Sequence, residues 1–187
     1  MITATTYSTM RIEHTSVPMG NATELTGQER HTGKFIDMLP KSEVQKEIST
    51  SGLAGCTALA LYLLYKNNKQ RVILMHQPLI EDLHTELQSL LFKKIPSTTV
   101  ARMHAVIFSP YIPEQAEFFL EKKIVSLKKK IQRFGITTHF LTHGYILRCP
   151  LFTQRSLHVM LKNNPEESHY IICDDTLPSY PRPFNHN

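Results

Sequence analysis

Short apolar runs, several of them rich in β-branched residues, recur along the chain and predict strands. They cover residues 44–50, 71–75, 98–109, 136–141, 156–161 and 170–173. Turn-forming residues, among them Gly144, Pro150 and residues 163–165, separate the later runs. Residues 56–65 form a further apolar run. Its alanines and leucines fit a helix as well as a strand, because periodicity cannot separate the two over about ten residues.

Two other segments carry apolar residues at helical spacing. They are residues 80–95 and residues 113–134, and the second begins at Pro113 and ends before Gly135. Strands and helices are therefore mixed along the chain. We expect a layered α+β fold in which a mixed β-sandwich core is flanked by helices.

The length of 187 residues and a hydrophobic content of 41% suit one ordinary domain. The segment before residue 41 is rich in Thr, Ser and Gly, and the last ten residues contain three prolines in a short stretch. We therefore expect an N-terminal arm over residues 1–40, irregular in part, a main domain over residues 41–177, and a proline-rich tail over residues 178–187.

Cysteine usage and hydropathy indicate the compartment. Three cysteines, Cys56, Cys149 and Cys173, are an odd number at no metal-like spacing, which favours reduced thiols in a reducing compartment. The N-terminal residues lack the apolar core of a secretory signal, and the longest apolar run is shorter than the roughly 20 residues of a membrane-spanning helix. We expect a cytoplasmic protein with no membrane contact, or one delivered into the cytosol of a host cell.

One cysteine lies in a setting that favours chemistry. The segment reads Thr50-Ser-Gly-Leu-Ala-Gly-Cys56, and the strand predicted over residues 71–75 ends at His76. A nucleophilic cysteine needs an imidazole or another group that lowers its pKa from about 8.5. Gly52 and Gly55 allow backbone N–H groups to approach a reacting carbonyl and bind the developing oxyanion. A turn near Asn68 would place residue 56 close to residue 80 in an antiparallel pair, near His76.

These residues resemble a known family of glutamine deamidases. Thr50 to Cys56, followed by a turn and a strand ending in His76, is similar to the motif of the chemoreceptor deamidase CheD. The stretch ending in Gly55-Cys56 is also similar to the cytotoxic necrotizing factor catalytic domain and the Burkholderia lethal factor. The resemblance implies a deamidase-like catalytic domain in residues 41–177. It further implies that Cys56 is the nucleophile, His76 the general base and Thr50 the third member of the site. The match covers about 30 residues, and the interval from Cys56 to His76 is longer than in the family.

Ordinary structural roles compete with these assignments. Cysteine is among the most buried residue types, a histidine beside an apolar strand can bond to a carbonyl, and a threonine at a turn can bond to nearby backbone. His104 is an alternative base. A zinc site is a further reading of the residues His139, His143, Cys149 and His158, whose spacing fits no standard pattern. Asp174 and Asp175 could orient a histidine or bind a cation, although a solvated loop end is their simpler interpretation.

The segment 113–134 also carries a basic stripe. Lys122, Lys129 and Arg133 would lie on one side of the predicted helix and could contact an acidic protein surface.

We expect a monomeric deamidase without metal or organic cofactor, with transglutamination as a side activity. Its substrate would be a protein bearing a reactive glutamine rather than a nucleic acid, and the short motif favours a bacterial effector or virulence toxin. The alternative is a non-enzymatic adaptor whose basic helix binds an acidic protein or RNA.

Overall fold

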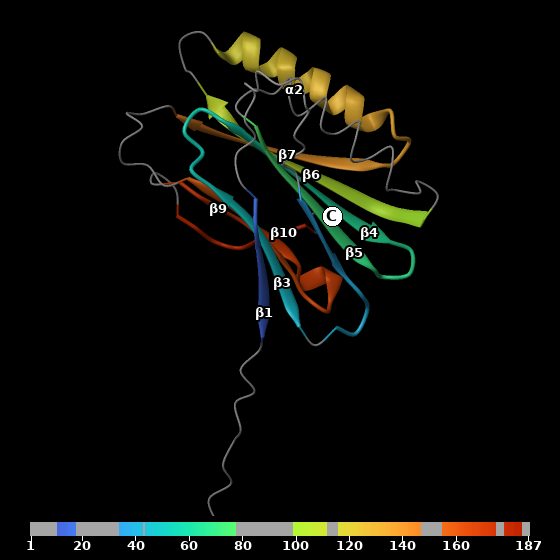
Figure 1. Ribbon diagram of the computed structural model, residues 1–187. Helices are drawn as coiled ribbons and strands as arrows, with labels where there is room; N and C mark the ends of the chain where they lie inside the picture. The colour runs from blue at the N-terminus through green and yellow to red at the C-terminus, as the bar shows by residue number, and fades with distance from the viewer. Residues whose placement is uncertain are drawn as a thin grey trace, which may run out of the picture.

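Two sheets make up most of the structure. The computed structural model describes residues 11–17, 34–42, 44–77, 99–111, 116–146, 155–174 and 178–184. The first sheet holds, in spatial order, β1 (Ile12–Ser16), β3 (Gln45–Ser51), β8 (Ser156–Leu161), β9 (His169–Cys173) and β10 (Arg182–Pro183). The second holds β2 (Lys34–Met38), β5 (Gln70–Gln77), β4 (Thr57–Tyr65), β6 (Val100–Tyr111) and β7 (Thr138–Ile146). The helix α2 (Ala116–Gln132) lies over β6 and β7 (Figure 1).

Both sheets are mixed. β1 runs parallel to β3 and β6 runs parallel to β7, whereas the other neighbouring strands are antiparallel. The β4–β5 hairpin turns at residues 66–69, where Asn68 has a φ of 61°. Asparagine tolerates this left-handed conformation better than most residues. The register that follows pairs Thr57 with Gln77 and Ala58 with His76.

Apolar side chains on alternate strand positions fill two interfaces. Ile48, Leu157 and Val159 of the first sheet face Ala58 and Val72 of the second, and these residues belong to one buried cluster between the sheets. The opposite face of the second sheet packs against α2 through Ile124, Leu127 and Ile131. A strand such as β4 is thus buried on both faces, which explains its continuous apolar sequence.

The expected α+β class with flanking helices is wrong. The described residues form a β-rich structure of two mixed sheets, and α2 is their one α-helix. It covers a single face. The outer face of the first sheet carries polar side chains such as Glu47, Ser49 and His158, which need no apolar helix to cover them. The helix expected over residues 80–95 lies outside the described residues, and no described helix has the length and apolarity to cross a membrane.

Strands also form where the sequence indicated irregular chain. β1 and β2 lie within the expected N-terminal arm, and each contributes a strand to a different sheet. In the proline-rich tail, β10 pairs with β9, and Phe184 stacks on Tyr62 with ring centroids 4.2 Å apart. Gly144 does not divide two strands but lies within β7. The run over residues 56–65, whose type was open, is the strand β4.

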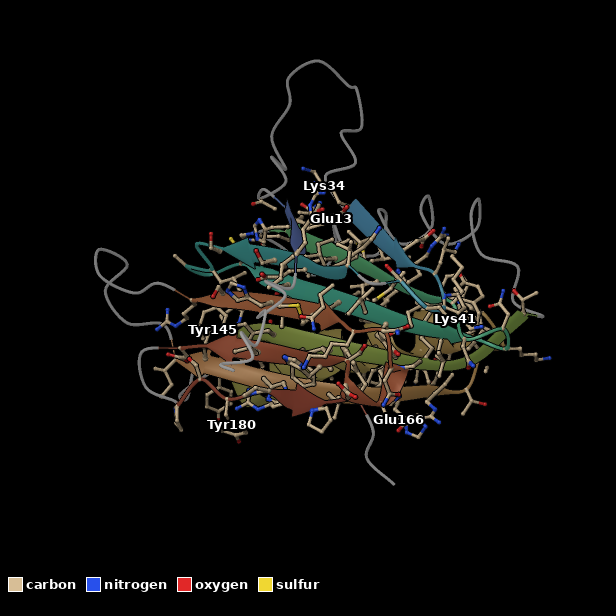
Figure 2. All side chains as sticks on the ribbon, turned by 90° about the horizontal axis from the view of Figure 1, so that it is seen from below. Glu13, Lys34, Lys41, Tyr145, Glu166 and Tyr180 are labelled. Atoms are coloured by element: carbon tan, nitrogen blue, oxygen red, sulfur yellow. The ribbon has the colours of Figure 1, made fainter. Side chains whose placement is uncertain are left out.

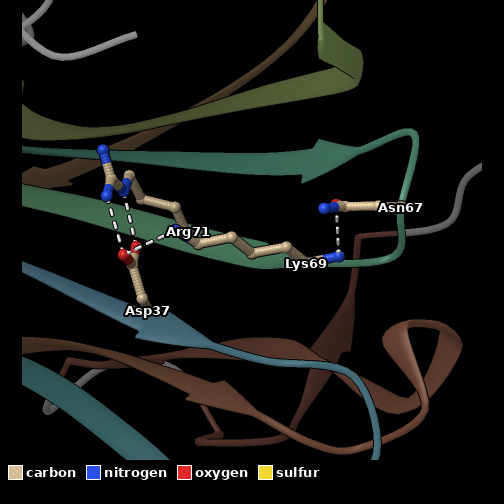
Figure 3. A network of polar contacts seen from close by, with 4 residues as sticks. All are labelled: Asp37, Asn67, Lys69 and Arg71. Atoms are coloured by element: carbon tan, nitrogen blue, oxygen red, sulfur yellow. Dashed lines mark hydrogen bonds and ion pairs between the residues drawn. The ribbon is translucent and has the colours of Figure 1, made fainter.

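A charged network joins the edge strand β2 to β5 (Figure 3). The Arg71 guanidinium donates two hydrogen bonds to the Asp37 carboxylate, and Lys69 Nζ lies 2.9 Å from the same group. Burial raises the pKa of Asp37, but the hydrogen bonds from Arg71 and Lys69 outweigh burial and leave the pKa below its ordinary value. This contribution to stability is therefore present above the ordinary carboxyl pKa of 3.8 and is lost as the pH falls through the lower folded-state value.

We expect Asp37→Asn to lower the free energy of unfolding at pH 7 by about 1–2 kcal/mol, because it removes one side of a half-buried, doubly bonded ion pair. Urea denaturation at pH 7 and at pH 3 measures the effect, which should shrink at the lower pH. Glu13→Gln is the control, since Glu13 is exposed and its contact with Lys46 is 3.5 Å long. An equal loss in both variants would contradict a special role for the Asp37 network.

Candidate active site

Cys56 lies at the end of a tight turn that leads from β3 into β4. Both glycines of the turn have left-handed backbone conformations, with φ of 74° at Gly52 and 98° at Gly55. A side chain would strain the backbone at either position, which explains why glycine occupies them. Leu53 N–H donates to the Arg155 carbonyl, and Ala54 N–H donates to the Gly52 carbonyl. The turn therefore presents Cys56 at the margin of the core between the two sheets.

The β4–β5 register brings His76 beside this turn. His76 is paired with Ala58, so Cys56 and His76 are diagonal neighbours on the same face of the second sheet. Such neighbours have Cα atoms about 7–8 Å apart, a separation that an imidazole ring can span. The pair Thr57–Gln77 shows a register that differs by two positions from the predicted one. It still places residue 56 close to His76, as the turn near Asn68 predicted.

Thr50 reaches His76 from the opposite sheet. Its Oγ1 lies 2.7 Å from His76 Nδ1 and donates a hydrogen bond of 2.8 Å to the Val17 carbonyl. The single hydroxyl proton is used toward Val17, so the hydroxyl oxygen must accept from His76 Nδ1–H. The proton of the neutral imidazole is therefore on Nδ1, and Nε2 keeps its lone pair. Thr50 holds the tautomer that a general base requires.

Burial sets the charge of both candidate reacting groups. His76 is 1% exposed, and burial lowers its pKa to about 4. Its Nε2 atom is buried and has no hydrogen-bond partner among the described residues. Burial raises the pKa of Cys56 above its ordinary value, against a smaller lowering effect of a hydrogen bond with the Ala54 backbone. At neutral pH the two groups are thus a neutral thiol and a neutral imidazole, not the thiolate with lowered pKa that the motif led us to expect.

No pattern in the sequence indicated a third part of the site, which consists of Tyr145 on β7 (labelled in Figure 2) and Arg155 directly before β8. Tyr145 is buried, accepts a hydrogen bond of 3.1 Å from Gly55 N–H, and donates one to the Cys56 carbonyl. The Arg155 guanidinium lies 4.7 Å from the centre of the Tyr145 ring and 3.5 Å from the Asp174 carboxylate. Asp174 is therefore a buried ion-pair partner and not part of a solvated loop end. Asp175 lies outside the described residues.

His104 is too distant to replace His76. It is paired with Tyr62, six residues along β4 from Cys56, which corresponds to about 20 Å at the rise of a strand. Its ring stacks on that of His139 with centroids 5.0 Å apart and also contacts Phe184. The alternative base is therefore separated from the cysteine by most of the length of β4.

The histidines considered for zinc are divided between different places. His143 on β7 bonds to the Tyr170 hydroxyl, whereas His158 on the first sheet bonds to Glu47 and to Ser156. No group of three or more metal-ligating side chains occurs in the part of the chain that the structure describes. Cys149 lies outside that part. His143 and His158 thus bond to protein groups in separate places.

The basic stripe consists of Lys122 and Lys129 on α2 and Arg133 directly after it, and it lies away from this turn. Lys122, Lys129 and Arg133 are exposed, and the helix side that carries Ile124, Leu127 and Ile131 is buried against the second sheet. A partner could reach the exposed side, and a role of these three residues in target binding stays a prediction.

The sequence matches no protein-family model and no curated protein. Among the solved structures that match is the C-terminal domain of CNFy from Yersinia pseudotuberculosis, with a TM-score of 0.42 and 11% sequence identity. The match covers 81% of this chain and 59% of that chain. A likeness at this TM-score and identity establishes neither the family nor the activity of this chain.

Proposed function

We propose that this protein is a cysteine amidohydrolase that deamidates a glutamine side chain of a partner protein. The observation that carries the proposal is the bond from His76 Nδ1–H to Thr50, which leaves a buried, neutral Nε2 atom beside the Cys56 turn. A positioned base next to a cysteine at a tight glycine turn is an arrangement suited to nucleophilic acyl chemistry. The motif similarity described above supports glutamine as the substrate.

The reaction begins with the neutral pair. Cys56 Sγ attacks the carboxamide carbon, and its proton passes to His76 Nε2. His76 returns that proton to the departing nitrogen. The C–N bond then breaks, ammonia departs, and the acyl group remains on Cys56 as a thioester. Water then attacks the thioester with His76 as base, and the glutamate product leaves as the thiol re-forms. An amine in place of water would give transglutamination.

Backbone N–H groups of the glycine turn would stabilise the oxyanion in this scheme. The Gly55 N–H already donates to Tyr145, so this group holds the turn in its conformation rather than binding the oxyanion. An oxyanion role for the Gly52 and Gly55 segment stays a prediction. We also propose that Lys122, Lys129 and Arg133 select the protein substrate, because a charged helix face mainly steers encounter with an oppositely charged partner.

Mass spectrometry of treated proteins tests the function. The wild-type protein and the Cys56→Ser variant are incubated separately with bacterial and with eukaryotic cell extracts, and peptides are screened for glutamine-to-glutamate conversion. This conversion adds about one dalton and releases ammonia, by the chemistry of hydrolysing a carboxamide. Sites converted only by the wild-type protein would support the proposal. Identical conversion in both samples would contradict it, and salt-sensitive partner binding without any mass change would favour the adaptor.

Thr50→Val should lower kcat by roughly 10-fold or more, because removing a group that orients the reacting side chain typically costs 10–100-fold. Valine retains the shape of threonine but cannot accept from Nδ1, so the imidazole loses its fixed tautomer. Thr57→Val is the matched control. Thr57 is also buried, but its hydroxyl bonds to Ser109 at 2.8 Å. Equal losses of kcat in the two variants would assign Thr50 a packing role only.

A further inference from the structure

Tyr145 touches the nucleophile turn at two points with a single atom. Its hydroxyl oxygen accepts from Gly55 N–H and its proton is donated to the Cys56 carbonyl. These two backbone groups are separated by the peptide that joins Gly55 to Cys56, so the hydroxyl fixes that peptide at both ends. Burial raises the pKa of Tyr145 well above its ordinary value, which keeps the hydroxyl protonated and able to make both bonds.

The Tyr145 ring is itself held in place by charged groups. The Arg155 guanidinium lies over the ring, donates to the Ile146 carbonyl at 2.9 Å and forms a buried ion pair with Asp174. The Arg155 carbonyl accepts from Leu53 N–H. Arg155, directly before β8, therefore supports the beginning of the turn through its carbonyl and the end of the turn through the Tyr145 ring.

We infer that Tyr145 is a positioning residue that locks the Gly55–Cys56 turn so that the thiol faces His76. The lock matters because Gly55 has no side chain to restrict it and adopts a φ of 98°. Without the two hydrogen bonds the turn could sample other conformations, and small misplacements of a reacting group are costly. Tyr145 lies 90 residues from Gly55 in the chain, so the folded β-sandwich is a condition for an ordered site. The catalytic part of this inference rests on the proposed function.

Thiol alkylation tests the lock without any substrate. Tyr145→Phe keeps the ring and its contact with Arg155 but removes the hydroxyl. Iodoacetamide modification of Cys56, followed by peptide mass spectrometry, should then proceed roughly 10-fold faster than in the wild type, because local opening exposes a thiol that is only 6% exposed. Greater exposure also lowers the thiol pKa and so increases the reactive thiolate fraction, which means that both effects raise the alkylation rate.

Two internal comparisons separate local opening from general destabilisation. Cys173, on β9, should keep its wild-type alkylation rate within about two-fold in Tyr145→Phe, since it is held by pairing with Ser156 of β8 and Tyr145→Phe keeps the ring that contacts Arg155. Tyr170→Phe is the matched variant, because Tyr170 is equally buried and its hydroxyl bonds to His143 instead. An unchanged Cys56 rate in Tyr145→Phe, or an increase shared by Cys173 or by Tyr170→Phe, would overturn the inference.

The catalytic readout is a split between kcat and KM. On a substrate found by the mass experiment, Tyr145→Phe should lower kcat on the order of 10-fold or more and leave KM within about two-fold, since a misdirected nucleophile affects the chemical step rather than binding. Faster alkylation with unchanged kcat would show a lock that catalysis does not need and would overturn the positioning role. If the wild-type protein deamidates nothing, the proposed function fails while the alkylation comparison still decides whether Tyr145 locks the turn.

Discussion

Replacing Cys56 with serine should lower the rate of ammonia release on the order of 10⁴-fold or more, the largest effect expected of any single substitution in this chain. The hydroxyl is a much weaker acid than the thiol, and His76, with a pKa of about 4, is too weak a base to activate it. The change from sulfur to oxygen is nearly isosteric, so the circular dichroism spectrum and the melting temperature should stay close to those of the wild type. Single-turnover assays on an identified substrate give the rate.

Cys173→Ser provides the control for general effects of losing a thiol. Cys173 lies on β9 of the first sheet and is paired with Ser156, whereas Cys56 directly precedes β4 of the second sheet. The Cys173 variant should retain at least about half of the wild-type rate, as expected for a substitution outside the site. A Cys56→Ser protein that keeps a tenth of the wild-type rate would rule out Cys56 as the nucleophile.

Local sequence was sufficient to predict the hairpin that carries the site. Asn67 and Asn68 indicated the turn, and residues 71–75 indicated the strand that ends beside Cys56. The register follows from counting outward from that turn, which is why the proximity of Cys56 and His76 was predictable to within two positions. The strands over residues 156–161 and 170–173 were equally clear, because each is a compact apolar run between turn residues.

The fold class was not predictable from the same signals. β4 is buried on both faces, so its sequence lacks the alternation that identifies a strand, and the helix reading remained open. β1 carries polar side chains on exposed positions and resembles an irregular arm until β3 pairs with it. Edge strands of this kind are specified by their neighbours rather than by their own hydrophobic pattern.

The site was predictable only in the part formed by nearby sequence. Thr50 lies on β3, Cys56 directly before β4 and His76 on β5, and their order in the chain indicated a candidate site. Tyr145 and Arg155 come from distant strands and meet the turn through contacts across the sandwich. The pKa of Cys56 also depends on this packing, because the core that surrounds the turn disfavours the thiolate.

His76→Asn should lower the single-turnover rate on the order of 10²-fold or more, the usual effect of removing a positioned acid–base group. Asparagine can still donate an N–H to Thr50, so the bond between the sheets can persist while the base is lost. The wild-type kcat/KM should be insensitive to pH near neutrality and fall toward pH 4, where His76 becomes protonated. The residual rate of the variant should lack this acid limb. His139→Asn, which replaces an exposed imidazole on β7, should behave like the wild type.

The same protonation should appear in the stability of the fold, which makes the assignment testable without a substrate. The folded pKa of about 4 lies below the unfolded value near 6.5, so the contribution of His76 is fully present above pH 6.5 and is lost as the pH falls toward 4. The shift corresponds to about 3 kcal/mol. Urea denaturation across this range should show a steeper loss for the wild type than for His76→Asn. Equal dependence of stability on pH in the two proteins would mean that His76 is protonated as readily in the folded as in the unfolded state. Near-normal turnover in His76→Asn would exclude His76 as the base, and the β4–β6 register leaves His104 about 20 Å from the cysteine, too far to replace it.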